Sequence, residues 1–99
     1  MIFVKADIDP ELVSLIPDFI KYTLLDYEKL SSFYKLNDIG GMSSVCHTIL
    51  GSAKSYGFFQ LDQIIFNLQK ALKDGDEDSL QKWFETLGRY AEFLKEQYC

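Results

Sequence analysis

The chain has 99 residues, of which 47% are hydrophobic and 25% charged, and its formal net charge at pH 7 is −5. This length and apolar content fit one folded domain over residues 1–99 and argue against a disordered chain. Because the chain is acidic and has no cluster of Lys and Arg, binding to nucleic acid or to an anionic membrane surface is not expected.

The first helix signal is Asp9-Pro10-Glu11, where Asp9 is a candidate N-cap and Pro10 takes the first helical position. It predicts a short helix that runs to about Ile16, where Pro17 restarts or kinks the helix. The next helix carries one apolar stripe at steps of three or four residues and ends at the break Asn37-Asp38. That stripe comprises Ile16, Ile20, Thr23, Tyr27, Leu30 and Tyr34.

Asp38 is a candidate cap for a third helix, which contains His47 and ends at Gly57. A fourth helix is predicted from about Phe59 to Lys73, before the tight turn Asp74-Gly75-Asp76 and the last helix. The stripes expected to be buried are Leu61, Ile64, Ile65, Leu68 and Leu72 on the fourth helix, and Leu80, Trp83, Phe84, Leu87, Tyr90, Ala91 and Leu94 on the last. Short loops between amphipathic helices predict an all-α fold, an antiparallel up-down four-helix bundle with a short additional N-terminal helix.

His47 is the only histidine of the chain. At about 100° per residue, the apolar residues of its helix fall within about 140° of arc, which is expected to face the core. These residues are Ile39, Met42, Val45, Cys46, Ile49, Leu50, Ala53 and Tyr56. His47 lies roughly 130° from the centre of that arc, so its side chain is expected to point to solvent.

The residues three, four and seven positions from His47 are its neighbours on that helix face. They are Gly40, Ser43, Ser44, Leu50, Gly51 and Lys54. Each mid-helix glycine costs about 0.5–1 kcal/mol relative to alanine, so a bare surface kept at this cost indicates that a partner approaches His47 closely. Lys54 adds a positive charge suited to an anion. On the pattern alone, the alternative is an ordinary surface histidine with incidental glycines.

The run from His47 to Gly57, His-Thr-Ile-Leu-Gly-Ser-Ala-Lys-Ser-Tyr-Gly, followed by Leu61, resembles the signature of histidine-containing phosphotransfer (HPt) domains. Asp9-Pro10-Glu11-Leu12, with Leu15-Ile16-Pro17 and Phe19, is similar to the first helix of that family. The resemblance spans nearly the whole chain. It implies a phosphorelay protein, whose histidine accepts a phosphoryl group from a receiver-domain aspartate and passes it to another receiver.

Carried over by position, the resemblance makes His47 the phosphoacceptor, and it makes Gly51 and Ser52 the small residues that admit the partner. Gln69 lies 22 positions after His47, where several members of the family have a glutamine that hydrogen-bonds near the imidazole. The helical wheel places Gln69 at the edge of the apolar stripe of its helix, which is compatible with that role.

One position departs from the family pattern. Most members have a lysine three residues after the histidine, but this chain has Leu50. Lys54 is a candidate substitute, because the wheel places it within about 20° of His47; the alternative is an ordinary surface lysine. The departure supports an alternative function, a catalytically silent adapter of the same fold that binds receiver domains without carrying phosphate.

The resemblance implies that the partners are receiver domains of response regulators or of a hybrid histidine kinase. Those domains would supply Mg²⁺, so no cofactor or metal site is expected in this chain. Without a Gly-rich phosphate loop, the chain is not expected to have an ATP-dependent kinase activity of its own. Docking is expected on the histidine face and its flank, at Gly40, Ser43, Ser44, Leu50, Ser55 and Phe66. Phe66 is included because the wheel directs it away from the core stripe, although single exposed aromatic residues are common on any surface.

Helix geometry disfavours two other functions. A haem-binding bundle needs His47 and a methionine to face one site, but Met42 lies on a different face from His47. A hydrolase with a Cys46–His47 pair is disfavoured because adjacent helical residues point in different directions.

The chain is expected to be a soluble, cytoplasmic, free-standing monomer with Cys46 and Cys99 reduced. Its N-terminal apolar run is too short for a signal peptide, and no segment approaches the roughly 18 apolar residues of a membrane span.

Overall fold

The computed structural model describes residues 1–98, and every regular element within them is helical. A 3-10 helix, η1 (Pro10–Leu15), leads directly into α1 (Ile16–Lys35), which is followed by α2 (Ile39–Ala53), α3 (Phe59–Asp74) and α4 (Glu77–Tyr98). Asp9 caps η1, where its side chain accepts a hydrogen bond from the Glu11 N–H. Pro17 does not interrupt α1, because it lies in the first turn, where a backbone N–H has no partner within the helix.

The first three α-helices end in the same way, with one residue in the left-handed backbone region just past the last turn. These residues are Asn37, Gly57 and Gly75, with φ of 55°, 87° and 68°. The N–H that follows each of them bonds to the carbonyl five residues earlier, at 2.9–3.0 Å. This Schellman arrangement satisfies carbonyls that the helix leaves unpaired and reverses the chain within a short connection.

α2 ends at Ala53, so the prediction that it continues to Gly57 was wrong. Gly57 does close the helix end, but the residues before it form a turn. The Gly57 N–H bonds to the Lys54 carbonyl at 3.1 Å, and the Phe58 N–H bonds to the Ala53 carbonyl at 2.9 Å. The Tyr56 N–H keeps the regular spacing, with a bond of 3.1 Å to the Ser52 carbonyl, whereas the bonds of Gly57 and Phe58 depart from it. Lys54 and Ser55 lie in the turn after the helix.

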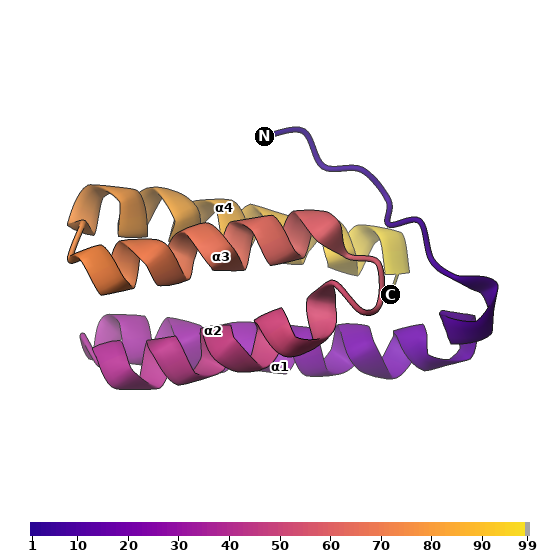
Figure 1. The fold of residues 1–99 in the computed structure, drawn as a ribbon, viewed down its shortest axis with the longest axis horizontal. Helices are drawn as coiled ribbons and strands as arrows, with labels where there is room; N and C mark the ends of the chain where they lie inside the picture. The colour runs from indigo at the N-terminus through magenta and orange to yellow at the C-terminus, as the bar shows by residue number, and fades with distance from the viewer. Residues whose placement is uncertain (99) are drawn as a thin grey trace.

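The helices surround one hydrophobic core. α1 packs on α2 and α4, and α3 packs on the same two helices. In Figure 1 the α1–α2 and α3–α4 connections lie at one end of the molecule and the α2–α3 connection at the other. One cluster of buried side chains draws on all four helices. The predicted stripe of α3 is buried along its whole length, whereas those of α1 and α4 each include half-buried aromatic residues.

The N-terminal segment lies along the bundle without forming a regular element (Figure 1). The amide of Gln60 holds it twice, because Nε2 donates to the Ile2 carbonyl at 2.7 Å and Oε1 accepts from the Val4 N–H at 2.9 Å. Between these anchors the Phe3 ring packs edge-on against Tyr90, with ring centroids 5.1 Å apart. Sequence patterns gave no sign of this attachment, since it depends on side chains more than 50 positions away.

Candidate functional site

α2 begins at a well-defined cap. Asp38 is its N-cap, and Oδ1 accepts a hydrogen bond from the Gly41 N–H at 2.9 Å. The left-handed Asn37 immediately before it turns the chain out of α1. The start of α2 is therefore fixed, and the rotation of the helix about its axis determines which side chains reach solvent.

His47 lies exposed in the middle of α2, while the adjacent Cys46 is fully buried, at 0% exposed. This agrees with the helical-wheel prediction for both residues. Burial raises the pKa of the Cys46 thiol to about 12, so the thiol stays protonated near neutral pH. Cys46 and His47 therefore do not form a nucleophile–base pair. Met42 is buried as well, so it does not share a site with the exposed imidazole.

The glycines of α2 differ in what surrounds them. A Cβ built on Gly51 meets no atom within 4 Å, and one on Gly40 meets only a carboxylate oxygen of Asp38, at 3.7 Å. A Cβ on Gly41 would instead lie 2.7 Å from the Phe33 ring. Packing within the chain therefore explains Gly41 but not Gly40 or Gly51, the two that flank His47. Their small size leaves the outer face of α2 open.

The other residues predicted around His47 differ in their exposure to solvent. Ser44 is exposed, Ser43 and Leu50 are half-buried, and Leu50 packs against the core. Lys54 and Ser55 are exposed in the turn after α2. The docking face predicted from the sequence thus runs from the start of α2 into the turn that follows it.

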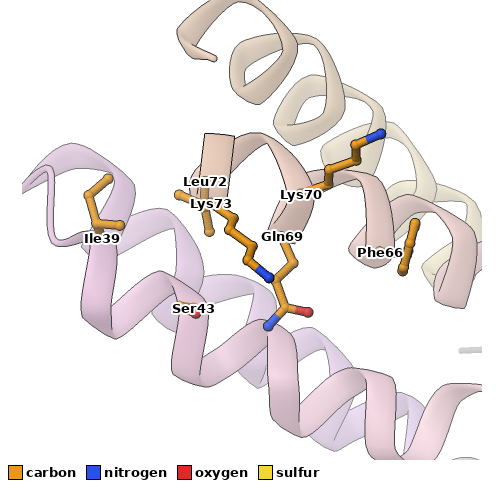
Figure 2. A pocket seen from close by; sticks show the side chains of 7 residues that line it. All are labelled: Ile39, Ser43, Phe66, Gln69, Lys70, Leu72 and Lys73. Atoms are coloured by element: carbon orange, nitrogen blue, oxygen red, sulfur yellow. The ribbon is translucent and has the colours of Figure 1, made fainter. Parts of the chain in front are cut away.

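A groove of about 570 Å³ opens between α2 and α3 beside this face. Figure 2 shows the side chains that line it, Ile39, Ser43, Phe66, Gln69, Lys70, Leu72 and Lys73. The groove brings together three of the predicted site residues, Ser43, Phe66 and Gln69. Phe66 is 59% exposed, as expected from the wheel, and Gln69 is half-buried. Ser43 lies one helical turn before His47, which does not itself line the groove.

Sequence reasoning missed part of this groove. Ile39 was predicted to face the core, but it is 49% exposed and lines the groove, because it is the first residue of α2 and lies at the end of the bundle. Lys70 and Lys73 were not singled out. The signal was present, since Phe66, Gln69 or Lys70, and Lys73 follow each other at helical spacing on one face of α3.

One lysine, Lys73, extends into the groove of a protein whose net charge is −5. The lining of the groove includes Lys70 and Lys73 and no acidic residue. The one salt bridge among residues 1–98 joins Lys95 to Glu92, so neither groove lysine is paired with a carboxylate. In Figure 2 the Lys73 ammonium and the Gln69 amide both extend towards α2, whereas Lys70 points outwards. The groove thus offers the hydrogen-bond donors of Gln69 and the positive charge of Lys73, and its Ser43 lies one helical turn along α2 from the exposed His47.

Within residues 1–98, no group of three or more His, Cys, Asp or Glu side chains is arranged to hold a metal ion. No helix in that range is both long enough and apolar enough to cross a membrane. Cys99 lies outside the described residues.

No model of a known protein family matches the chain, and no curated protein or solved structure is similar enough to be matched to it.

Proposed function

We propose that the protein is a phosphocarrier of the HPt kind, in which His47 accepts a phosphoryl group from a receiver-domain aspartate and delivers it to another receiver. The observation that carries the proposal is the placement of the single histidine. It is exposed in the middle of a bundle helix, between two glycines that packing within the chain does not require. A nucleophile that must enter the active site of another protein needs this kind of unobstructed surface.

The proposal includes the antiparallel up-down order of the four helices, a cytoplasmic location and a monomeric state. In such a bundle a rigid helix, and not a mobile loop, presents the nucleophile. A rigid support favours transfer because the reacting atoms must be held in line within a fraction of an ångström.

Imidazole chemistry suits the reaction, because a histidine side chain ordinarily has a pKa of about 6.5 and is largely neutral at cytoplasmic pH. In the proposed step the lone pair of Nε2 attacks phosphorus, and the bond from phosphorus to the aspartyl oxygen breaks. The aspartate leaves as a carboxylate and His47 carries the phosphoryl group. Attack by an aspartate of a second receiver reverses these events. Mg²⁺ belongs to the receiver in this scheme.

Two side chains are proposed to lie next to the phosphoryl group. Gln69 extends from α3 towards α2 and offers amide N–H donors (Figure 2). Lys54, past the end of α2, keeps helical backbone angles of −65° and −39°, so the wheel that places it on the His47 face still applies to it. Both groups would stabilise negative charge on phosphate oxygens.

Phosphotransfer to wild-type protein and to His47→Gln tests the proposal. Each is mixed with members of a panel of phosphorylated receiver domains, and the protein is then assayed for acid-labile, alkali-stable label. We expect label on the wild type and none on His47→Gln, with the same far-UV circular dichroism for both. Label on His47→Gln, or on neither protein when no receiver binds, would refute the proposal.

The silent adapter remains the second candidate, and one observation favours it. Leu50 is half-buried against the core at the position where the resemblance places a phosphate-neutralising lysine. An adapter would bind receivers with the same affinity before and after the His47→Gln substitution and would carry no label in either case.

A further inference from the structure

We propose that the N-terminal segment (residues 1–9) is a releasable strap, which holds the turn between α2 and α3 (residues 54–58) when it is closed and leaves that turn loose when it is open. This inference does not depend on the phosphocarrier function, because it concerns a conformational change built into the fold. Three observations carry it: the contacts of the strap meet at the turn, the strap backbone lies directly on a glycine of the turn, and little of the strap is buried.

The hydrogen bonds of the strap meet where the turn enters α3. Gln60, in the first turn of α3, bonds to the strap backbone through both the oxygen and the nitrogen of its side-chain amide. The Ala6 N–H donates to the hydroxyl of Tyr98 at 3.0 Å, near the end of α4. The Tyr98 ring in turn packs edge-on against Phe58, the last residue of the turn, with ring centroids 5.6 Å apart. The closed strap therefore links the end of the turn to α3 and to α4.

The closest approach of the strap to the turn is at Gly57. A Cβ built on Gly57 would lie 2.7 Å from the Asp7 carbonyl oxygen and 4.0 Å from the Ile8 Cα, so the two backbones touch with no side chain between them. Figure 1 shows the strap running past this end of the bundle to η1. Because neither backbone can move towards the other, the closed strap limits the conformations that the turn can reach.

The turn is a place where such a limit matters. Gly57 has a φ of 87°, and glycine has more backbone freedom than any other residue. Lys54 and Ser55 lie exposed in the same turn. An event that opens the strap therefore changes the mobility of the surface that follows α2. By linkage, a partner that binds the open strap loosens the turn, and one that binds the closed strap stiffens it.

The strap is attached weakly enough to open by itself. None of residues 1–9 is buried, and Phe3, Ala6 and Ile8 are only half-buried against the core. Both bonds to Gln60 are exposed to solvent. Segments with few buried apolar contacts and exposed hydrogen bonds open at a much lower free energy than the core. We therefore expect the strap to open while the four helices stay folded.

Native-state hydrogen exchange followed by NMR spectroscopy tests the inference on the whole chain. Gln60→Ala removes both amide bonds to the strap and does not weaken the first turn of α3, since alanine is the stronger helix former. Phe3→Ala changes the strap itself by removing the ring that packs on Tyr90. Gln63→Ala is the matched control, because Gln63 is exposed one turn further along the same helix.

In wild type, we expect the amide of Ala6 in the strap and those of Gly57 and Phe58 in the turn to have protection factors at least about tenfold below those in the middle of α3. In Gln60→Ala and in Phe3→Ala, the protection factors of these three amides should fall together, by about threefold to tenfold. Gln63→Ala should leave them unchanged.

Two results would overturn the inference. If Ala6 lost protection in both strap variants while Gly57 and Phe58 kept theirs, the strap would open without holding the turn. If Ala6 in wild type exchanged as slowly as the middle of α3, the strap would open only when the whole domain unfolds.

Discussion

The two faces of α2 meet opposite requirements. On the inner face, Cys46 is fully buried and Gly41 leaves room for the Phe33 ring of α1. On the outer face, His47 is exposed and a side chain on Gly51 would meet no atom of the chain. Packing within the chain explains the inner residues. It does not explain Gly51, which costs helix stability, and under the proposed function a partner accounts for it.

The largest expected effect is on the inner face. In Gly41→Ala the new Cβ would lie 2.7 Å from the Phe33 ring and 2.9 Å from a carboxylate oxygen of the capping Asp38. Even after the gain in helix propensity, we expect the free energy of unfolding to fall by about 1–2 kcal/mol. Urea unfolding followed by circular dichroism measures this change.

Gly40→Ala is the matched control, one residue away. Its Cβ would meet only an Asp38 oxygen, at 3.7 Å, so its stability should equal or exceed that of wild type. If both substitutions had the same effect, the contrast between the two faces would not hold at the start of the helix.

A second expected effect concerns Cys46 and alkaline pH. Burial raises the pKa of its thiol from 9.0 to about 12 in the folded protein. Between these values the unfolded chain has lost the thiol proton while the folded chain keeps it, so stability falls as pH rises from 9 towards 12. Burial likewise raises the pKa of Tyr90, which adds to the decline above pH 10.

Cys46→Ala isolates the contribution of the thiol. The variant should be less stable at neutral pH because it leaves a cavity, yet its unfolding free energy should decline less steeply between pH 9 and 12. Parallel curves for the two proteins would show that Cys46 does not titrate differently in the folded and unfolded states.

The smallest expected change in stability is on the outer face. Gly51→Leu places a strong helix former in open space, so the free energy of unfolding should rise by about 0.5–1 kcal/mol. Transfer from a phosphorylated receiver should nevertheless slow, because the side chain occupies the surface one turn after His47. Unchanged labelling by phosphoramidate is the control for the imidazole itself. A stabilised variant with full receiver transfer would mean that Gly51 is not kept for a partner.

Local rules were enough to predict most of the fold. The caps at Asp9 and Asp38, the left-handed turn at Gly75 and the buried stripe of α3 follow from residue type and helical spacing. The early end of α2 could not be predicted in the same way. There, hydrogen bonds to the carbonyls of Ala53 and Lys54 depart from the regular helical spacing, and this depends on where the chain must turn to reach α3.

In the candidate site, too, features set within one helix could be predicted from the sequence, and features formed between two helices could not. The exposure of His47 follows from its own helix, so the sequence predicted it. The groove is formed by two helices, and the exposure of Ile39 depends on how α2 meets α3 at the end of the bundle. Helical spacing alone places Phe66, Gln69 and Lys73 on one face of α3. It does not show that Ile39 and Ser43 of α2 line the opposite side of the same groove, which only the packing of the two helices determines.

The most direct measurement is NMR spectroscopy of the imidazole of His47 in protein labelled with ¹⁵N and incubated with a phosphorylated receiver. We predict that the Nε2 resonance moves and shows coupling to phosphorus, while the backbone resonances of α1 and α4 stay in place. An imidazole spectrum that does not change while the receiver binds α2 and α3 would contradict the phosphocarrier function and identify the protein as an adapter.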